Sequence, residues 1–156
     1  MNKNLDWPLM KNSINATQKN AMIKFIKGTD RFTNGEKVKE FEEKWAAWQG
    51  TNYSLFVNSG GSANLLLLDA IADAYFRNKD RSWKAGRPPK VLVPACTWGT
   101  TIAPLIQVGY EIVYCDIDLQ TYSFHQASMK RIADESNAPI DIVWITHLLG
   151  SPSNIN

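Results

Sequence analysis

Residues 56–71 read FVNSGGSANLLLLDAI, where an apolar run passes through small and polar residues directly into a longer apolar run. The first run is short and carries an aromatic and a β-branched side chain, which is typical of a strand, whereas the second has the length of a helix. We therefore expect a strand that turns into a helix near residues 58–62. This stretch predicts that strands and helices alternate along the rest of the chain.

The turn itself is a candidate anion site. Gly60, Gly61 and Ser62 are small enough for a ligand to approach the backbone. The start of the following helix presents unpaired N–H groups and the positive end of its dipole, which favour a phosphate. The stretch lacks the third glycine of G-x-G-x-x-G and the lysine of a P-loop, so it specifies neither a dinucleotide nor a nucleoside triphosphate. The alternative is a tight strand-to-helix turn in which Ser62 is only the helix cap.

Short apolar runs continue to alternate with helical periodicity after this turn. Strands separated by about a dozen helix-like residues are typical of βαβ units around a parallel sheet, whose strands are apolar on both faces because helices cover both. The predicted fold class is therefore α/β, with three α/β/α layers and a mostly parallel sheet. The predicted strands are 53–58, 90–95, 111–118 and 141–150, and the helices are 62–76, 100–109 and 125–136.

Two amphipathic helices are predicted ahead of these units. The first covers residues 16–27 and stops at Gly28, and the second follows a capping-box spacing at residues 33–36 and stops at Gly50. The second helix has an aromatic stripe that we expect to pack on a core rather than to bind a cofactor. The stripe contains Phe41, Trp45 and Trp48.

Composition and charge exclude several classes of protein. The chain has 156 residues, 44% hydrophobic and 21% charged, which is typical of a soluble globular domain. A net charge of +2 gives no reason to expect nucleic acid binding. There is no apolar leader and no run near the ~20 residues of a membrane span. The two cysteines lack metal or disulfide spacing, so we expect a cytoplasmic protein.

A second candidate site follows the strand predicted at residues 90–95. Trp98 stands at the carboxyl end of this strand, where open α/β sheets collect their ligands, and its ring could stack on a planar heterocycle. The alternative is a packing residue beside a turn. Cys96 has no identifiable base to activate it, and we interpret it as structural.

Three further polar features are interpreted as structural. The loop at residues 78–90 is basic and is expected to be a solvated connection rather than a site for an acidic ligand. Asp116 and Asp118 point to opposite faces of an extended chain, so we expect turn and cap roles and no metal site. His147 has no fixed partner and is expected to be a hydrogen-bonded structural residue.

Several motifs, in this order, resemble the DegT/DnrJ/EryC1/StrS family of sugar aminotransferases. The resemblance implies the aspartate aminotransferase fold, that is, the fold type I large domain of a pyridoxal 5'-phosphate (PLP) enzyme, with an incomplete sheet in this chain. It also implies a division into an N-terminal helical segment, 1–35, and the first part of the PLP-binding domain, 36–156. The motifs are FTNGEKVKEFEEKWAAWQG (32–50), FVNSGGSANLLL (56–67), VLVPACTWGTTIAPLIQVG (91–109), EIVYCDIDLQTYSF (111–124) and VWITHLLGSP (143–152).

The resemblance also implies roles for individual residues. The small-residue turn of the family receives the coenzyme phosphate, which here places Gly60, Gly61 and Ser62 at the phosphate and Ala63 at the start of the helix. Gly61 stands where the family usually has Thr or Ser, so one hydroxyl contact is missing. The aromatic residue that stacks on the pyridine ring corresponds to Trp98.

Three details are similar to one branch, the CDP-4-keto-6-deoxyglucose 3-dehydrases. They are SGGSANL, the long basic loop, and TTIAPLIQVG together with HLLGSP. That branch uses pyridoxamine 5'-phosphate (PMP) and has His in place of the Schiff-base Lys, so that it removes the C3 oxygen instead of transferring an amine. The Lys or His and the acidic partner of the pyridine nitrogen lie beyond residue 156 in the family pattern. We therefore expect an N-terminal piece of a longer enzyme, inactive and poorly stable alone, with no assignable catalytic residue.

The predicted function is a PLP-dependent aminotransferase that acts on nucleotide-linked keto sugars in polysaccharide or amino-sugar biosynthesis. The first alternative is the PMP-dependent 3-dehydrase, and the second is a non-catalytic module that binds a phosphate ligand. The family resemblance implies a nucleotide-sugar substrate, an amino donor and a homodimer.

Overall fold

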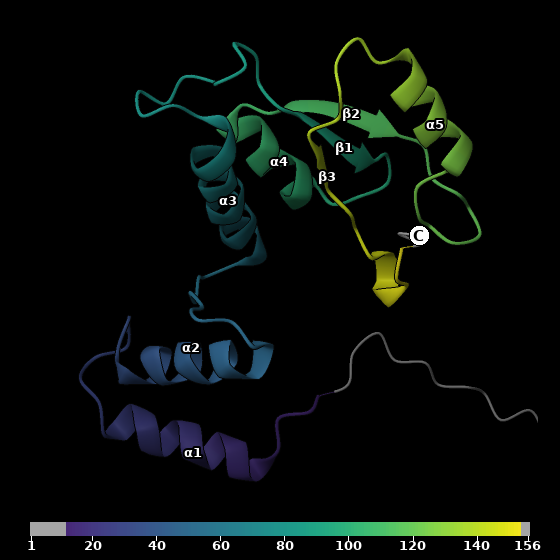
Figure 1. Ribbon diagram of the computed structural model, residues 1–156. Helices are drawn as coiled ribbons and strands as arrows, with labels where there is room; N and C mark the ends of the chain where they lie inside the picture. The colour runs from purple at the N-terminus through teal and green to yellow at the C-terminus, as the bar shows by residue number, and fades with distance from the viewer. Residues whose placement is uncertain (1–11, 154–156) are drawn as a thin grey trace, which may run out of the picture. The chain divides into compact units, whose positions relative to one another are not determined.

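The computed structural model describes residues 12–153, and these form two compact units that divide between Phe56 and Val57. The first unit contains two helices, α1 (Ala16–Lys27), at the residues predicted for it, and α2 (Glu36–Gln49), which begins later than predicted. Figure 1 shows both helices in purple and blue. The N-cap of α1 is Asn15, which forms a reciprocal capping box with Gln18.

The capping box predicted for α2 is wrong. The N-cap is Gly35, which has no side chain to accept a hydrogen bond, and Thr33 lies outside the helix. Asn34 has a φ of 50°, a left-handed conformation that a right-handed helix cannot include, so the helix begins only at Glu36. Its other end is as predicted, because Gly50 has a φ of 71° and closes the helix in the conformation that favours glycine.

The aromatic stripe of α2 is a row of rings that contact one another, stacked at the first pair and tilted at the second. Phe41 and Trp45 have ring centroids 5.9 Å apart, and Trp45 and Trp48 are 5.0 Å apart. The predicted packing on a core is absent from the described part of this unit, since Trp48 is 74% exposed. The rings cover one another instead of an apolar interior.

The second unit contains a three-stranded parallel sheet of order β2-β1-β3 (Figure 1). The central strand β1 pairs with β2 from Lys90–Glu111 to Pro94–Cys115, and with β3 through Val91 and Leu92. The strands are β1 (Lys90–Pro94), β2 (Glu111–Cys115) and β3 (Ile142–Val143); the helices are α3 (Gly60–Ile71), the π-helix η1 (Ala72–Phe76), α4 (Gly99–Val108), α5 (Gln126–Glu135) and the 3-10 turn η2 (Leu148–Gly150).

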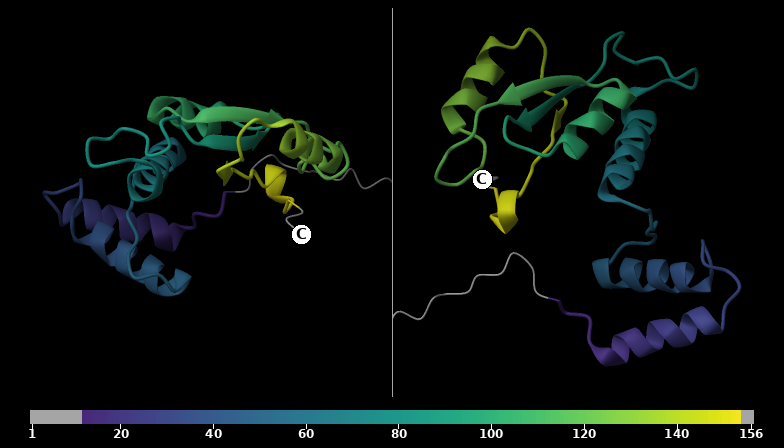
Figure 2. Two further views of the ribbon diagram at one scale, coloured as in Figure 1. Left: turned by 45° about the horizontal axis from the view of Figure 1, so that its top comes forward. Right: turned by 180° about the vertical axis from the view of Figure 1, so that it is seen from behind.

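Alternate side chains of β1 enter two different cores, which confirms the predicted three layers. Val91 and Val93 pack with Leu68 of α3 and Leu105 of α4. Leu92 lies in the other cluster, where partly buried residues of α5 pack against it. Successive side chains of a strand point to opposite faces of the sheet. Helices α3 and α4 therefore cover one face, and α5 covers the other. Both views of Figure 2 show α5 well apart from α3.

Only three of the four predicted strands form. Residues 53–57 carry no strand assignment, and no described residue pairs with them, although this run has the composition of a strand. The reason is that a strand is defined by its neighbour, and the backbone of a lone segment has no ladder to join. The last strand is shorter than predicted, since β3 has only two residues.

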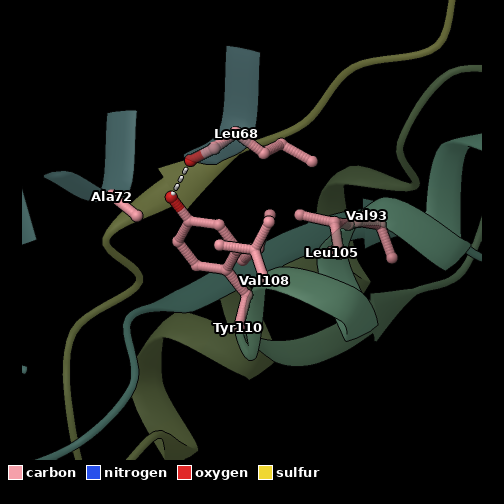
Figure 3. Packing of buried hydrophobic residues seen from close by; sticks show 7 residues of the cluster. Leu68, Ala72, Val93, Leu105, Val108 and Tyr110 are labelled. Atoms are coloured by element: carbon pink, nitrogen blue, oxygen red, sulfur yellow. Dashed lines mark hydrogen bonds between the residues drawn. The ribbon is translucent and has the colours of Figure 1, made fainter. Parts of the chain in front are cut away.

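A buried tyrosine joins the end of α4 to α3 within the first core (Figure 3). The Tyr110 hydroxyl donates a hydrogen bond of 2.8 Å to the backbone carbonyl of Leu68. Burial raises the pKa of Tyr110 to about 12, because the charged phenolate is poorly solvated there. Each fully buried leucine of this core contributes roughly 1.5–3 kcal/mol relative to an exposed one.

The basic loop after η1 is held by acidic side chains of the same chain. Arg77 is 9% exposed and binds Asp69 and Asp73 at 2.8 and 3.1 Å, and its guanidinium lies 4.7 Å above the ring of Trp83. Arg81 binds the same two carboxylates. Arg77, just before the predicted loop, and Arg81 within it are thus engaged within the chain, and the solvated connection remains a prediction. No described helix is both long and apolar enough to cross a bilayer.

Candidate functional site

Helix α3 begins at Gly60, two residues before the start predicted from the apolar pattern and three before Ala63, where the family resemblance placed it. Its N-cap is Ser59, whose backbone is extended and whose Oγ accepts a hydrogen bond of 3.2 Å from the Ser62 N–H. The alternative role of Ser62 as the cap is therefore wrong. Gly60, Gly61 and Ser62 instead form the first turn of the helix, which we call the cradle.

The cradle suits an anion. Helix geometry leaves the N–H groups of Gly60 and Gly61 without an intrahelical acceptor, and the first helical bond is the one from Ala63 to Ser59, 3.0 Å long. A Cβ added at Gly60 would meet no atom within 4 Å, so there is space beside this backbone. The first turn of α3 contains no acidic residue that would repel a phosphate. These features fit the phosphate of a B6 coenzyme.

The Ser62 hydroxyl is already hydrogen-bonded within the chain. It donates to Asn58 Oδ1 at 2.7 Å and lies 3.1 Å from the hydroxyl of Ser59, which donates to it. A ligand oxygen would therefore have to replace Asn58 Oδ1 as the acceptor of the Ser62 hydroxyl proton. The two glycine N–H groups have no such competitor.

The second predicted feature, Trp98, lies at the start of α4, just beyond the carboxyl end of β1. It is the N-cap residue of α4, and its carbonyl accepts a hydrogen bond of 2.9 Å from the Thr101 N–H. Its side chain is 71% exposed and forms none of the ring–ring contacts in the described chain. The indole is therefore accessible to a planar ligand.

The structure brings the cradle and the start of α4 together. The Asn64 Nδ2 atom donates a hydrogen bond of 3.3 Å to the Thr100 carbonyl, across 36 positions of sequence. A Cβ at Gly61 would lie 3.9 Å from Thr100 Cβ, which is ordinary van der Waals contact. On the other side, the hydroxyls of Thr97 and Thr146 are 2.8 Å apart and join the ends of the two neighbouring strands.

The remaining candidates have structural surroundings. Cys115 is buried, which raises the pKa of its thiol, while Cys96 is exposed. Asp118 accepts hydrogen bonds from the N–H groups of residues 120 and 121, and these bonds lower the pKa of its carboxyl. His147 Nδ1 accepts a hydrogen bond of 3.0 Å from the Ser153 N–H, as expected of a structural histidine. Residues 12–153 contain no acidic, histidine and cysteine cluster suited to a metal.

Sequence reasoning missed three residues that shape the site, namely Asn58, Ser59 and Asn64. The spacing from Ser59 to Ser62 is a helix-cap signal that could have been recognised. Once the helix is known to start at Gly60, Asn58 is recognised as the residue directly before the Ser59 cap. Asn64 carries no local signal, because its partner is distant in the sequence.

The geometry agrees with the family resemblance. A profile of the DegT/DnrJ/EryC1/StrS aminotransferase family matches residues 13–156. The chain belongs to this family. Its α/β fold is that of the PLP-dependent aminotransferases, as its structural neighbours show.

Curated relatives of this DegT/DnrJ/EryC1/StrS chain include sugar dehydratases. The GDP-4-keto-6-deoxy-D-mannose 3-dehydratase of Yersinia pseudotuberculosis is 34% identical over 152 residues, which are 97% of this chain and 36% of that protein. The structure of the E. coli GDP-4-keto-6-deoxy-D-mannose-3-dehydratase with bound hydrated PLP has a TM-score of 0.75 and 28% identity, and the match covers 96% of this chain and 36% of that one.

An aminotransferase of the same fold is more distant in sequence. PseC of Helicobacter pylori, an aminotransferase involved in the biosynthesis of pseudoaminic acid, has a TM-score of 0.64 and 19% identity, with 86% of this chain and 32% of that chain covered. At this identity the likeness shows the fold alone. The chain spans about a third of the length of the curated relatives described above.

Proposed function

We propose that this chain is the N-terminal third of a B6-dependent enzyme that modifies a nucleotide-linked 4-keto-6-deoxy sugar. The observation that carries the proposal is the placement of the cradle against the start of α4, whose N-cap residue is the exposed Trp98, with Asn64 bonded to Thr100 between the two helices. A phosphate site next to a free aromatic face suits a phosphorylated planar cofactor. Membership of the family and the PLP of a solved relative support the same cofactor.

We assign the roles of the residues from their positions and from the family resemblance. The N–H groups of Gly60 and Gly61 bind the phosphate, Ser62 adds a hydroxyl when it turns from Asn58, and the indole of Trp98 lies against the pyridine ring. Ala63 continues the helix whose dipole favours the anion. When bound, the coenzyme supplies an electron-withdrawing ring for removing a hydroxyl or transferring an amine. The groups described here hold and orient it.

Between the two reactions, the relatives favour removal of the C3 oxygen. The dehydratases share about a third of their residues with this chain over most of its length, whereas the solved aminotransferase PseC shares 19%. We therefore place the PMP-dependent dehydratase first and the PLP-dependent aminotransferase second. Their names further suggest GDP, rather than CDP, as the nucleotide of the sugar.

We also propose that the enzyme is a cytoplasmic homodimer. The free thiols of Cys96 and Cys115 are suited to a reducing compartment. The amino donor, which restores the amino form of the coenzyme, and the nucleotide sugar are its two small-molecule partners. The net charge of +2 gives no reason to expect a nucleic acid partner.

The test uses the full-length protein, purified with PLP. It is incubated with glutamate as the amino donor and with a GDP-linked 4-keto-6-deoxy sugar, and the product is identified by mass spectrometry. A deoxygenated sugar supports the dehydratase and an amino sugar supports the aminotransferase. Retained coenzyme without a product would indicate the non-catalytic binding module. A protein that holds no B6 coenzyme after gel filtration would refute both enzyme functions.

A further inference from the structure

The carbonyl of Thr100 is exceptional within helix α4. In a regular helix it would accept a bond from the N–H of residue 104, but that residue is Pro104, which has no N–H. A proline ring also crowds the carbonyl four residues before it, which turns that oxygen away from the helix ladder. Thr100 therefore presents an acceptor that the regular bond from residue 104 does not use.

Asn64 of α3 supplies the missing donor. Its Nδ2 lies 3.3 Å from the Thr100 carbonyl, and its own position is one turn beyond the cradle. The same carbonyl belongs to the first turn of α4, two residues after Trp98. The side-chain amide of Asn64 thus joins α3, which forms the cradle, to α4, whose N-cap residue is Trp98.

We propose that Asn64 is a positioning residue that sets the spacing between the phosphate cradle and the indole of Trp98, through the Thr100 carbonyl, to which Pro104 donates no hydrogen bond. This inference rests on the proposed function, since it concerns the same cofactor site. The indole has no ring contact of its own in the described chain, so its place depends on its backbone. That backbone is held on one side by Thr97 with Thr146 and on the other by Asn64 with Thr100.

The cradle contacts do not include Asn64. Its amide bonds to α4, whereas the hydrogen bonds of the cradle run among Asn58, Ser59 and Ser62. Loss of the Asn64 amide should therefore leave the phosphate contacts intact and misplace the ring contact. Coenzyme binding should weaken only as far as stacking on Trp98 contributes to it.

The experiment is a double-mutant cycle in the full-length protein. The variants are Asn64→Leu, Trp98→Ala and the pair, and PLP affinity is measured together with the circular dichroism of the bound coenzyme. We expect Asn64→Leu to weaken PLP binding by no more than the 2- to 10-fold, about 0.5–1.5 kcal/mol, that stacking on Trp98 contributes, and to reduce the coenzyme dichroism. In the Trp98→Ala background, the same change should alter affinity less than about 2-fold.

Two further variants distinguish positioning of the indole from a general loss of stability. Asn137→Leu makes the same chemical change at an exposed position between α5 and β3 and should leave affinity and dichroism unchanged. Asn64→Ala repeats the test if the leucine variant does not fold, and thermal unfolding of every variant is recorded.

Equal losses of affinity with and without Trp98 would overturn the inference, as would an Asn64→Leu protein with unchanged affinity and dichroism. If the unsubstituted protein binds no PLP, the proposed function has failed. If it binds PLP while Asn64→Leu behaves like Asn137→Leu, only the role of Asn64 has failed.

Discussion

The space beside the cradle can be tested by adding one methyl group at Gly61. A Cβ at Gly61 would make only ordinary contacts at 3.9 Å, and its φ lies outside the left-handed region. We expect Gly61→Ala to raise the free energy of unfolding by roughly 0.5–1 kcal/mol, because glycine is entropically costly in a helix. Denaturant unfolding of the full-length protein, which is used for every substitution below, measures the change.

The matched control for that change is Gly109→Ala, at the end of α4. Gly109 has a φ of +92°, so an alanine there is strained and should destabilise the protein. If Gly61→Ala destabilised the protein as much as Gly109→Ala, the geometry described for the cradle would be incorrect.

Trp98 provides a second prediction. Trp98→Ala should weaken PLP binding about 2- to 10-fold, since an aromatic pair contributes roughly 0.5–1.5 kcal/mol. Fluorescence titration of the full-length protein measures the dissociation constant. Trp48→Ala removes an equally exposed indole from α2 and should leave PLP affinity unchanged. A loss of similar size in both variants would argue against stacking on Trp98.

The raised pKa of Tyr110 predicts that the protein loses stability at alkaline pH. Its pKa is near 10 in the unfolded chain and is raised to about 12 by burial. Its contribution is therefore fully present below pH 10 and is lost as the pH rises toward 12, because the unfolded state ionises first. Tyr110→Phe should lose about 1 kcal/mol at neutral pH through the bond to Leu68 and should show a weaker decline above pH 10. Urea unfolding at pH 8 to 11.5 measures both effects, and an unchanged alkaline slope would contradict the assignment.

At the scale of elements, Arg77 connects α3, α4 and the basic loop. Its guanidinium binds Asp69 and Asp73, donates to the Val108 carbonyl at 2.8 Å, and covers the ring of Trp83. We expect Arg77→Met to reduce stability by about 1.5–3 kcal/mol, as for hydrogen bonds to charged groups, which unfolding in urea measures. The hydrogen bond from Arg77 lowers the pKa of the Asp69 carboxyl. Part of the stability that this bond contributes should therefore disappear as the pH falls below 4.

The control for Arg77 is an exposed ion pair. Lys37 binds Glu40 on the surface of α2, where both side chains are largely in solvent. Lys37→Met should have no measurable effect on stability, because solvent screens such pairs. If the two substitutions had equal effects, the Arg77 cluster would be no more important than a surface pair.

Elements with a repeating pattern could be predicted from the sequence. The bounds of α1 and the end of α2 follow from apolar spacing and terminal glycines, and the three layers follow from alternating strands and helices. The capping box at Thr33 was wrong because Asn34-Gly35 is a turn dipeptide whose asparagine readily adopts the left-handed backbone, a signal that the prediction did not use. The strand at residues 53–58 failed because pairing depends on a neighbour that local sequence does not contain.

The candidate site was predictable only in its parts. The cradle and Trp98 could be identified from small residues and an aromatic residue at strand ends, and from the family resemblance. Their juxtaposition could not, since it depends on the packing of α3 against α4 and on a bond between Asn64 and Thr100. Contacts across 36 residues have no local pattern.

At the scale of the whole molecule, the described residues leave much apolar surface uncovered. Leu66 and Leu67 of α3 are about half exposed, and Leu55 and Phe56 are 71% and 55% exposed. Such surface is more than a stable monomer usually presents. It is consistent with a chain that spans about a third of its relatives.

The isolated 156 residues should therefore be poorly stable. We expect this chain to aggregate when concentrated, to bind the dye ANS and to show no cooperative thermal transition by circular dichroism. The full-length protein, which is the control, should unfold cooperatively. A soluble monomer of the short chain with a sharp transition would contradict this prediction.

The strand order has a consequence during biosynthesis. The middle strand, β1, emerges from the ribosome before both of its neighbours, and its second edge is covered only once Val143 has been made. At about 5–20 residues per second, a nascent chain would carry that open edge for several seconds. Chaperones that shield unpaired strands should therefore matter most between translation of Pro94 and Val143.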